Sequence, residues 1–159
     1  MHRTQVTTDW HLAFDHEASH HTVPASVPGN ALLDVLDAGL ISDPYFASNV
    51  DELESWESTR WTYSANIDIP ALGSDRLLLL RFDGIDTIAT IRVGGRCVAG
   101  SENMFVPISV DVTKFAGTRV RVEVEIESPI EREWERKRPA GARALSYNYA
   151  SLYLRKARH

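Results

Sequence analysis

Apolar and polar residues alternate through much of the chain, and this pattern predicts β-strands. Trp10, Leu12 and Phe14 stand at every second position between polar or small residues, as in a strand with one buried face. The run 120–126 places valine or isoleucine at alternate positions, with arginine or glutamate between them. Residues 56–69 continue the alternation with aromatic and small polar side chains. Many short strands separated by turn residues predict an all-β sandwich.

Two further segments are predicted as strands from their length and turn residues. The leucines of 77–80 form a run that is too short and too uniformly apolar for an amphipathic helix, so we expect a buried strand. Residues 85–98 predict a hairpin, because Gly94-Gly95 readily takes the positive φ values of a two-residue turn. That turn is expected to place Ile91 opposite Val98.

A single short helix is expected among these strands. Asn30 is a good N-cap, the apolar residues of 32–36 have helical spacing, and Gly39 suits the position that follows a helix. We expect this helix to cover one end of the sandwich. Residues 129–143 are rich in charge and contain Pro139-Ala140-Gly141, which predicts a solvated loop or a frayed turn.

Length and charge limit the function. The chain has 159 residues, one domain's worth, and it is too short for a sandwich together with a catalytic barrel of roughly 250 residues. The formal net charge of -5 opposes the basic surface that nucleic-acid binding needs, so no nucleic-acid partner is expected. No segment is long and apolar enough for a signal-peptide core or a membrane span, so no membrane association is expected.

Cysteine usage points to a compartment. Cys97 is the single cysteine, which excludes an internal disulfide framework, and no Asn-x-Ser/Thr sequon occurs. A cytoplasmic location is therefore the simpler expectation. Because no CxxC partner accompanies it, Cys97 is interpreted as an inert small hydrophobe beside the predicted turn.

Carboxylates are the first candidates for chemistry. A glycosidase needs two of them across the scissile bond, about 5–5.5 Å apart for retention or about 6.5–9.5 Å apart for inversion. Glu123, Glu125 and Glu127 lie on one face of a predicted strand. Such adjacent positions are typical of a solvated, mutually repelling edge, so no catalytic residue is predicted.

The histidines His16, His20 and His21 are the candidates for a metal site. A zinc site needs three or four ligands in a closed set, whereas only His16 and His20 have the spacing of one helix face. The residues around them show no helical periodicity, so a solvated loop is predicted instead. We predict neither a metal nor another cofactor.

Aromatic side chains are candidates for stacking on sugar rings. Trp10, Trp61 and Tyr63 lie inside strand patterns, where packing in the core is favoured. Two tyrosines in a polar segment near the end of the sequence allow either interpretation. The candidate sugar-binding residues are Tyr147, Asn148, Tyr149 and Arg155.

The order and spacing of several short motifs carry more information than any one of them. The motifs are Val27-Pro28-Gly29, Gly39 to Tyr45, Trp61-Thr62-Tyr63, Phe82 to Thr87, Asn103-Met104-Phe105 and Leu154 to Ala157. As an ordered set they resemble the N-terminal non-catalytic module of a β-mannosidase-like enzyme of glycoside hydrolase family 2. The resemblance implies a jelly roll of the galactose-binding-domain-like type with one short helix.

The resemblance also indicates what the sequence lacks. It stops at His159, before the family's Trp-Asp-Trp motif, its last strands and its catalytic barrel. We therefore expect residues 1–159 to be a single β-sandwich module, truncated relative to the family. The family's catalytic glutamates have no matching positions, so this chain alone is expected to be inactive.

In such enzymes, the resemblance implies, the module packs on the catalytic barrel and helps to wall the sugar pocket of a retaining exo-glycosidase. Two alternatives stay open: a stand-alone carbohydrate-binding module, and the same module from an exo-glucosaminidase, galactosidase or glucuronidase. A sandwich without its last strands leaves an unpaired edge. We therefore expect self-association through sheet edges or marginal stability, with residues 151–155 as a pairing segment.

Overall fold

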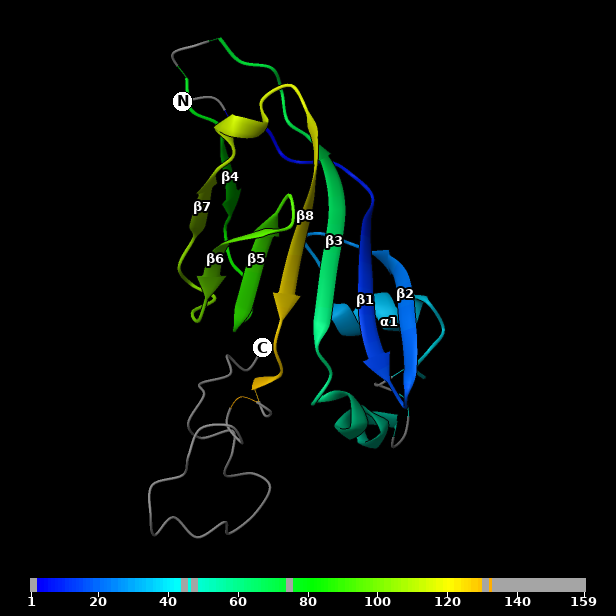
Figure 1. Ribbon diagram of the computed structural model, residues 1–159. Coiled ribbons are helices and arrows are strands. Elements are labelled where there is room, and N and C mark those ends of the chain that lie inside the picture. The colour runs from blue at the N-terminus through cyan, green and yellow to red at the C-terminus, as the bar shows by residue number, and fades with distance from the viewer. Residues whose placement is uncertain (1–2, 44–45, 47–48, 74–75, 130–131, 133–159) are drawn as a thin grey trace, which may run out of the picture.

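Antiparallel strands build the protein. A computed structural model gives the structure and describes residues 3–43, 46, 49–73, 76–129 and 132. In chain order the elements are β1 (Trp10–His16), β2 (Ser19–Ala25), α1 (Ala31–Asp37), the 3-10 helix η1 (Asn49–Trp56), β3 (Trp61–Asp68), β4 (Leu79–Phe82), β5 (Ala89–Val93), β6 (Arg96–Ser101), β7 (Ile108–Asp111), the 3-10 helix η2 (Thr113–Phe115) and β8 (Arg119–Ile126). One sheet has the order β2-β1-β3-β8-β5-β6, and β4 pairs with β7 in a second sheet (Figure 1).

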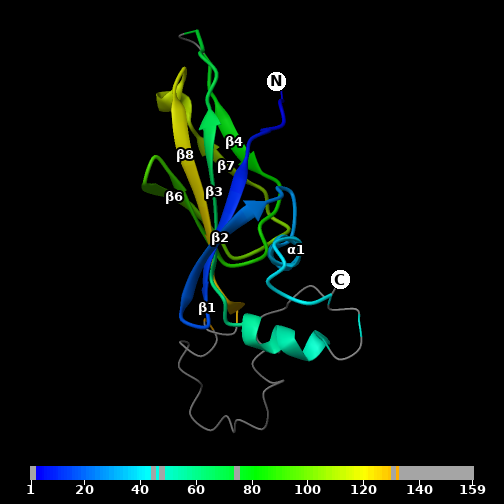
Figure 2. The same cartoon turned by 90° about the vertical axis from the view of Figure 1, so that its right-hand side faces the viewer.

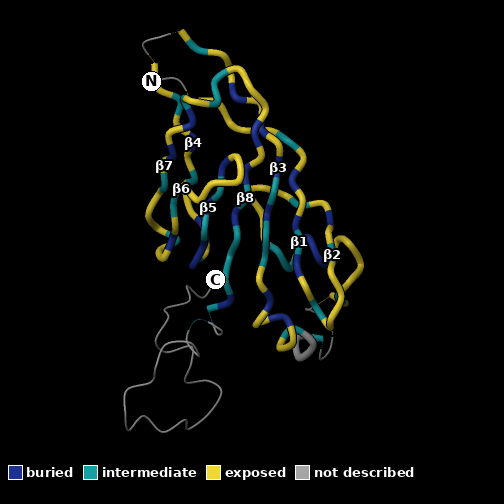
Figure 3. The backbone as a smooth tube through the Cα atoms, in the orientation of Figure 1, coloured by how far each residue is buried: buried dark blue, intermediate teal, exposed yellow. Residues whose placement is uncertain are grey.

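The register of the larger sheet explains which residues form the core. Leu12 of β1, Tyr63 of β3, Val124 of β8 and Ile91 of β5 face one another across the sheet, and all four are buried. Side chains alternate between the two faces of a strand, so this row and its neighbours two residues away line one covered face. Figure 3 shows buried segments recurring along these strands. The strands predicted around Trp10 and at 120–126 are confirmed.

The second sheet closes the core from the other side. Leu80 of β4 and Val110 of β7 join the same buried cluster as the row across the larger sheet. Both sheets are antiparallel, and each keeps one apolar face for the other. The predicted all-β sandwich is confirmed. Trp10 and Tyr63 lie in its core, as predicted, and Trp61 packs against it.

The predicted ends of the helix α1 are confirmed. Asn30 precedes it, and the Asn30 Oδ1 accepts a hydrogen bond from the Leu32 N–H at 2.9 Å. Gly39 follows it with a φ of 71°, a conformation that glycine adopts without steric cost. Figure 2 shows α1 and η1 on the same side of the larger sheet. None of the helices among the described residues is long and apolar enough to span a bilayer.

A buried carboxylate fixes α1 to the sheet. Asp34 accepts hydrogen bonds from the Ser26 N–H at 2.9 Å and from the Tyr63 hydroxyl at 3.3 Å. Burial, followed by the charge and hydrogen bond of Asp34, raises the pKa of Tyr63 well above its ordinary value. The hydroxyl therefore stays protonated and continues to donate to Asp34.

The strand predicted at 77–80 begins later and is buried on one face only. Leu77 is 72% exposed and Leu79 is 49% exposed, whereas Leu80 is 8% exposed. Among the described residues β4 has a covered face and a solvent face, so alternate leucines of the run point outward. The expectation of a fully buried strand is wrong.

The hairpin β5–β6 forms where the sequence predicted it, with a different register. Gly94 and Gly95 have φ values of 58° and 75°, which confirms the turn. Ile91 faces Ala99, because the pairing is irregular next to it. One extra residue in β6 makes a bulge. The prediction that Ile91 faces Val98 is therefore wrong.

The segment predicted as a loop around the histidines is a strand. Residues 19–25 form β2, which pairs with β1 over its whole length at the edge of the larger sheet. Pro24 is tolerated there because one side of an edge strand needs no backbone donor. Only Val23 of β2 is buried, so the sequence carries little apolar alternation. The 3-10 helix η1 was also not predicted.

Candidate functional site

The predicted sugar-binding residues Tyr147, Asn148, Tyr149 and Arg155 lie outside the described residues. The segment 151–155 and most of 129–143 lie outside them too. The described part of the chain brings chemically interesting side chains together in three places. These places are the outer face of the larger sheet, the aromatic cluster beside η1, and the end formed by the loops 83–88 and 102–107.

The outer face of the larger sheet carries the glutamates that the sequence singled out. Glu125 lies in register between Thr62 of β3 and Thr90 of β5. Because β8 is inside the sheet, Glu125 has strands on both sides. The expectation that these glutamates form a solvated, repelling edge is wrong.

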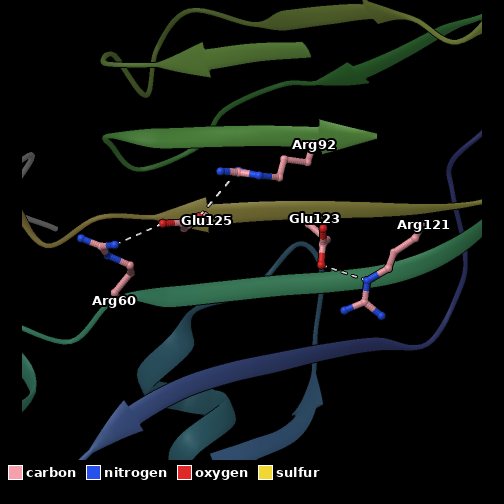
Figure 4. Close-up of polar contacts among 5 residues, drawn as sticks. All are labelled: Arg60, Arg92, Arg121, Glu123 and Glu125. Atoms are coloured by element: carbon pink, nitrogen blue, oxygen red, sulfur yellow. Dashed lines mark hydrogen bonds and ion pairs between the residues drawn. The ribbon is translucent and has the colours of Figure 1, made fainter. Parts of the chain in front are cut away.

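Arginines from β8 itself and from neighbouring segments form ion pairs with Glu123 and Glu125 (Figure 4). The Arg60 Nη1 lies 3.4 Å from the Glu125 Oε1, and the Arg92 Nη1 lies 3.7 Å from the Glu125 Oε2. The Arg121 Nε donates a hydrogen bond to Glu123 at 2.9 Å. The sequence could not reveal the first two pairs, because Arg60 and Arg92 are far from Glu125 along the chain.

This ladder of ion pairs does not form a glycosidase site. Catalytic carboxylates face each other across a substrate, with one kept free to donate a proton. Here Glu123 and Glu125 follow one another along a strand, and arginine holds each of them. Glu127 likewise lies 3.4 Å from the Arg132 Nη1. The arrangement stabilises a polar surface.

The aromatic cluster lies where β1 ends beside η1. His16 stacks on Trp56 with ring centroids 3.7 Å apart, and Trp56 lies parallel to Trp61 at 6.0 Å. Phe14 packs against both tryptophans and stacks on His21 at 5.1 Å. Trp56 is 7% exposed. Trp56 is stacked between two other rings, so its faces are not available to a sugar.

The three candidate metal ligands have separate roles. His16 and His21 stack on aromatic rings, and the His20 Nδ1 lies 2.8 Å from the Asp15 Oδ1. The described residues contain no group of three or more His, Cys, Asp or Glu side chains arranged to hold a metal ion. The histidines therefore belong to strand pairing and packing.

An open hollow of about 520 Å³ adjoins the aromatic cluster. Its lining consists of His16, Glu17, Leu40, Ile41, Glu54, Ser55 and Trp56. Carboxylates and a hydroxyl offer hydrogen bonds there, but His16 covers the face of Trp56. Among the described residues that line the hollow, Trp56 therefore offers no free face on which a sugar ring could stack.

Cys97 is exposed, contrary to its interpretation as a small hydrophobe. It lies on β6, the edge strand next to β5. An edge position leaves less neighbouring structure to cover a side chain, and the sequence does not tell an edge strand from an inner one.

The third place is the end of the sandwich where the loops 83–88 and 102–107 meet. A Cβ on Gly84 would lie 2.7 Å from the Met104 carbonyl oxygen, so only glycine lets the two loops approach this closely. Phe105 and Val106, on the second loop, are 76% and 54% exposed. The motifs Phe82 to Thr87 and Asn103-Met104-Phe105 thus meet in space, which their separation in the sequence did not reveal.

Comparison with known proteins identifies the fold. Residues 10–159 match the family described as glycosyl hydrolase 2 galactose-binding domain-like. The chain belongs to this family. The suspected resemblance to the non-catalytic module of family 2 glycoside hydrolases is therefore confirmed.

The chain is similar to β-mannosidases in both sequence and structure. It is 38% identical over 96 residues to β-mannosidase A of Emericella nidulans, an alignment that covers 60% of this chain and 10% of the relative. A crystal structure of β-D-mannosidase from Dictyoglomus thermophilum is 25% identical with a TM-score of 0.69, over 86% of this chain and 17% of that one. The chain therefore spans about a tenth of the curated relative's length.

A more distant structure shares the fold alone. The β-glucuronidase from Ruminococcus gnavus is 20% identical with a TM-score of 0.54, over 78% of this chain and 22% of that one. The fold is thus found in glycosidases whose names indicate different sugars. Its fold does not set the sugar specificity.

Proposed function

We propose that this chain is the non-catalytic N-terminal module of a β-mannosidase-like retaining exo-glycosidase. In that role it packs on the catalytic barrel and helps to shape the pocket for the sugar. The observation that carries the proposal is the similarity to β-mannosidases in both sequence and structure, at 38% identity and a TM-score of 0.69 respectively.

The geometry of the described residues supports a non-catalytic role. The glutamates of β8 are held by arginines on a strand face, and the rings of the aromatic cluster cover one another. A stand-alone carbohydrate-binding module would use exposed rings. Among the large hydrophobic side chains that are exposed, the aromatic ones are Phe46 and Phe105 within the described residues. Neither of these two rings lines a hollow within the described residues, which supports the role of a structural module for that part of the chain.

A cytoplasmic location is part of the proposal. The exposed thiol of Cys97 suits a reducing compartment, since an exposed free cysteine in an oxidising one is open to disulfide exchange. Fractionation of cells that express the longer protein would test the location directly.

The experiment that tests the function measures hydrolysis of aryl β-glycosides by the longer polypeptide that contains this module. We expect turnover of the β-mannoside with retention of configuration, and little turnover of the β-glucuronide or β-galactoside. The 159-residue chain alone is expected to give none. A preference for another aryl glycoside would overturn the assignment to mannosides. Turnover that scales with the purified short chain, and is abolished by one substitution within it, would overturn the non-catalytic role.

A further inference from the structure

The loop 102–107 presents two neighbouring apolar side chains to solvent. Phe105 is 76% exposed and Val106 is 54% exposed. Removal of apolar surface from water is favourable, so an exposed phenylalanine next to an exposed valine gains free energy from a partner. The remaining question is whether this loop holds those side chains in a fixed position.

Hydrogen bonds and close packing fix the loop. The Asn103 Oδ1 accepts a hydrogen bond from the Phe105 N–H at 2.9 Å, and the Asn103 carbonyl accepts one from the Val106 N–H at 3.2 Å. Met104 contacts the loop 83–88 at Gly84, as described above. The backbone that carries Phe105 is thus ordered before any partner binds. Preorganisation of this kind lowers the entropic cost of association.

The loop also lies close to the path by which the chain leaves β8. The loop 83–88 packs against Met104 at one end, and at its other end the Ile88 carbonyl accepts a hydrogen bond from the Glu127 N–H at 2.9 Å. The loop 83–88 therefore contacts both residue 104 and residue 127. In Figure 1, the β6–β7 connection and the end of β8 lie toward the same end of the molecule.

We propose that Phe105 and Val106 are the anchor through which this module docks on another domain of the same polypeptide, in an apolar pocket on that domain. The inference rests on the proposed function, in which the module is one part of a larger enzyme. Curated relatives are about ten times longer than the matched segment. The anchor lies toward the same end of the molecule as the end of β8, and loop 83–88 contacts both Met104 and Glu127, which favours a domain further along the chain as the partner.

The partner surface follows from the chemistry of the anchor. Aromatic side chains, phenylalanine among them, are enriched in the cores of interfaces, where surrounding contacts exclude water. The Oδ1 and the carbonyl oxygen of Asn103 already accept hydrogen bonds inside the loop, so the anchor itself offers the partner an apolar contact. A second copy of this chain is the competing occupant, and the experiment separates the two.

The first measurement is hydroxyl-radical footprinting of the longer enzyme, native and unfolded in urea. We expect oxidation of Phe105 to be slowed on the order of tenfold in the native enzyme, because an anchor loses most of its accessible surface in an interface. Equal rates in the two states would overturn the proposal. Protection that disappears on dilution would also overturn it, since that result assigns the site to a second copy.

The second measurement compares Phe105→Ser with Leu77→Ser in the same enzyme. Leu77 is 72% exposed and lies next to Leu78, whose N–H donates a hydrogen bond to the Thr113 Oγ1 in η2, at the other end of the sandwich from the loop. We expect Phe105→Ser to speed proteolytic release of the module severalfold, and Leu77→Ser to leave it unchanged. Equal release from both variants would contradict the docking role. Neither measurement uses a sugar. A negative result would therefore contradict the docking surface without testing the β-mannosidase assignment.

Discussion

The outer face of the larger sheet and the end that carries the loop 102–107 are both exposed, but they treat their side chains differently. On the sheet, the carboxylate of Glu125 lies between Arg60 and Arg92. On the loop, the backbone is hydrogen-bonded while Phe105 and Val106 remain uncovered. The carboxylate on the first surface is paired with charge within the chain, whereas the second surface is ordered and still apolar.

This difference separates a solvent face from a docking face. Exposed ion pairs gain little from a partner, because docking removes water from charges that are already paired. A rigid apolar projection gains free energy from burial and loses little entropy. Counting charged or apolar residues on the surface would not separate these two cases. Their contacts within the chain do.

Among substitutions on the two compared surfaces and their loops, the largest effect is expected from Gly84→Ala. The new Cβ would meet the Met104 carbonyl oxygen at 2.7 Å, so the backbone of one loop must move. Such overpacking typically costs about 1–3 kcal/mol of the free energy of unfolding. Denaturant unfolding of the chain measures the loss. Gly73→Ala is the matched control, since a Cβ there would meet nothing within 4 Å. Equal stability of the two variants would mean that the two loops do not brace each other.

The strands that the sequence predicted well are those whose alternation is simple. β1 and β8 each bury one face, so apolar residues at every second position marked them. The turn at Gly94-Gly95 and the cap at Asn30 follow from the local preferences of those residues, and both are confirmed. Local chemistry was enough at these places.

Features set by distant neighbours were missed. β2 buries a single valine at the edge of the sheet, so its sequence carried little alternation. Because of the bulge in β6, Ile91 pairs with Ala99 and not with Val98, and no local residue preference predicts this shift in register. The role of Glu125 depended on Arg60 and Arg92, which reach it only through the strand order. The loop contact at Gly84 has the same origin.

A smaller effect is expected from Glu125→Gln, which removes the charge between two arginines and keeps the side-chain shape. Both arginines are partly exposed, so we expect a loss of roughly 0.2–1 kcal/mol at low salt. Salt screens such pairs, and the difference from the parent chain should shrink as ionic strength rises. Urea unfolding at two salt concentrations measures it. A loss that does not depend on salt would show that packing, not charge, holds this face together.

The turn between β7 and η2 gives a third kind of surface, stabilised by a single exposed carboxylate. Hydrogen bonds from the Thr113 side chain and then from its backbone N–H lower the pKa of Asp111 below its ordinary value. A lowered pKa contributes stability above the unfolded-state value, and that contribution is lost as pH falls through the folded-state value. Asp111→Asn should therefore lower Tm slightly near neutral pH and match the parent at strongly acidic pH. A difference in Tm that grows on acidification would contradict this sign.

The smallest effect on stability is expected from Phe105→Ser in the 159-residue chain. Phe105 is 76% exposed, and its backbone hydrogen bond to Asn103 does not need the ring. Substitutions at such surface positions usually change the free energy of unfolding by less than about 0.5 kcal/mol. Leu80→Ser is the contrasting variant, because Leu80 is 8% exposed in the core and its loss should cost much more. Chemical denaturation of both variants measures the contrast. A large loss from Phe105→Ser would mean that the ring supports the fold of this chain, and the distinction between a satisfied face and a docking face would then fail at its central residue.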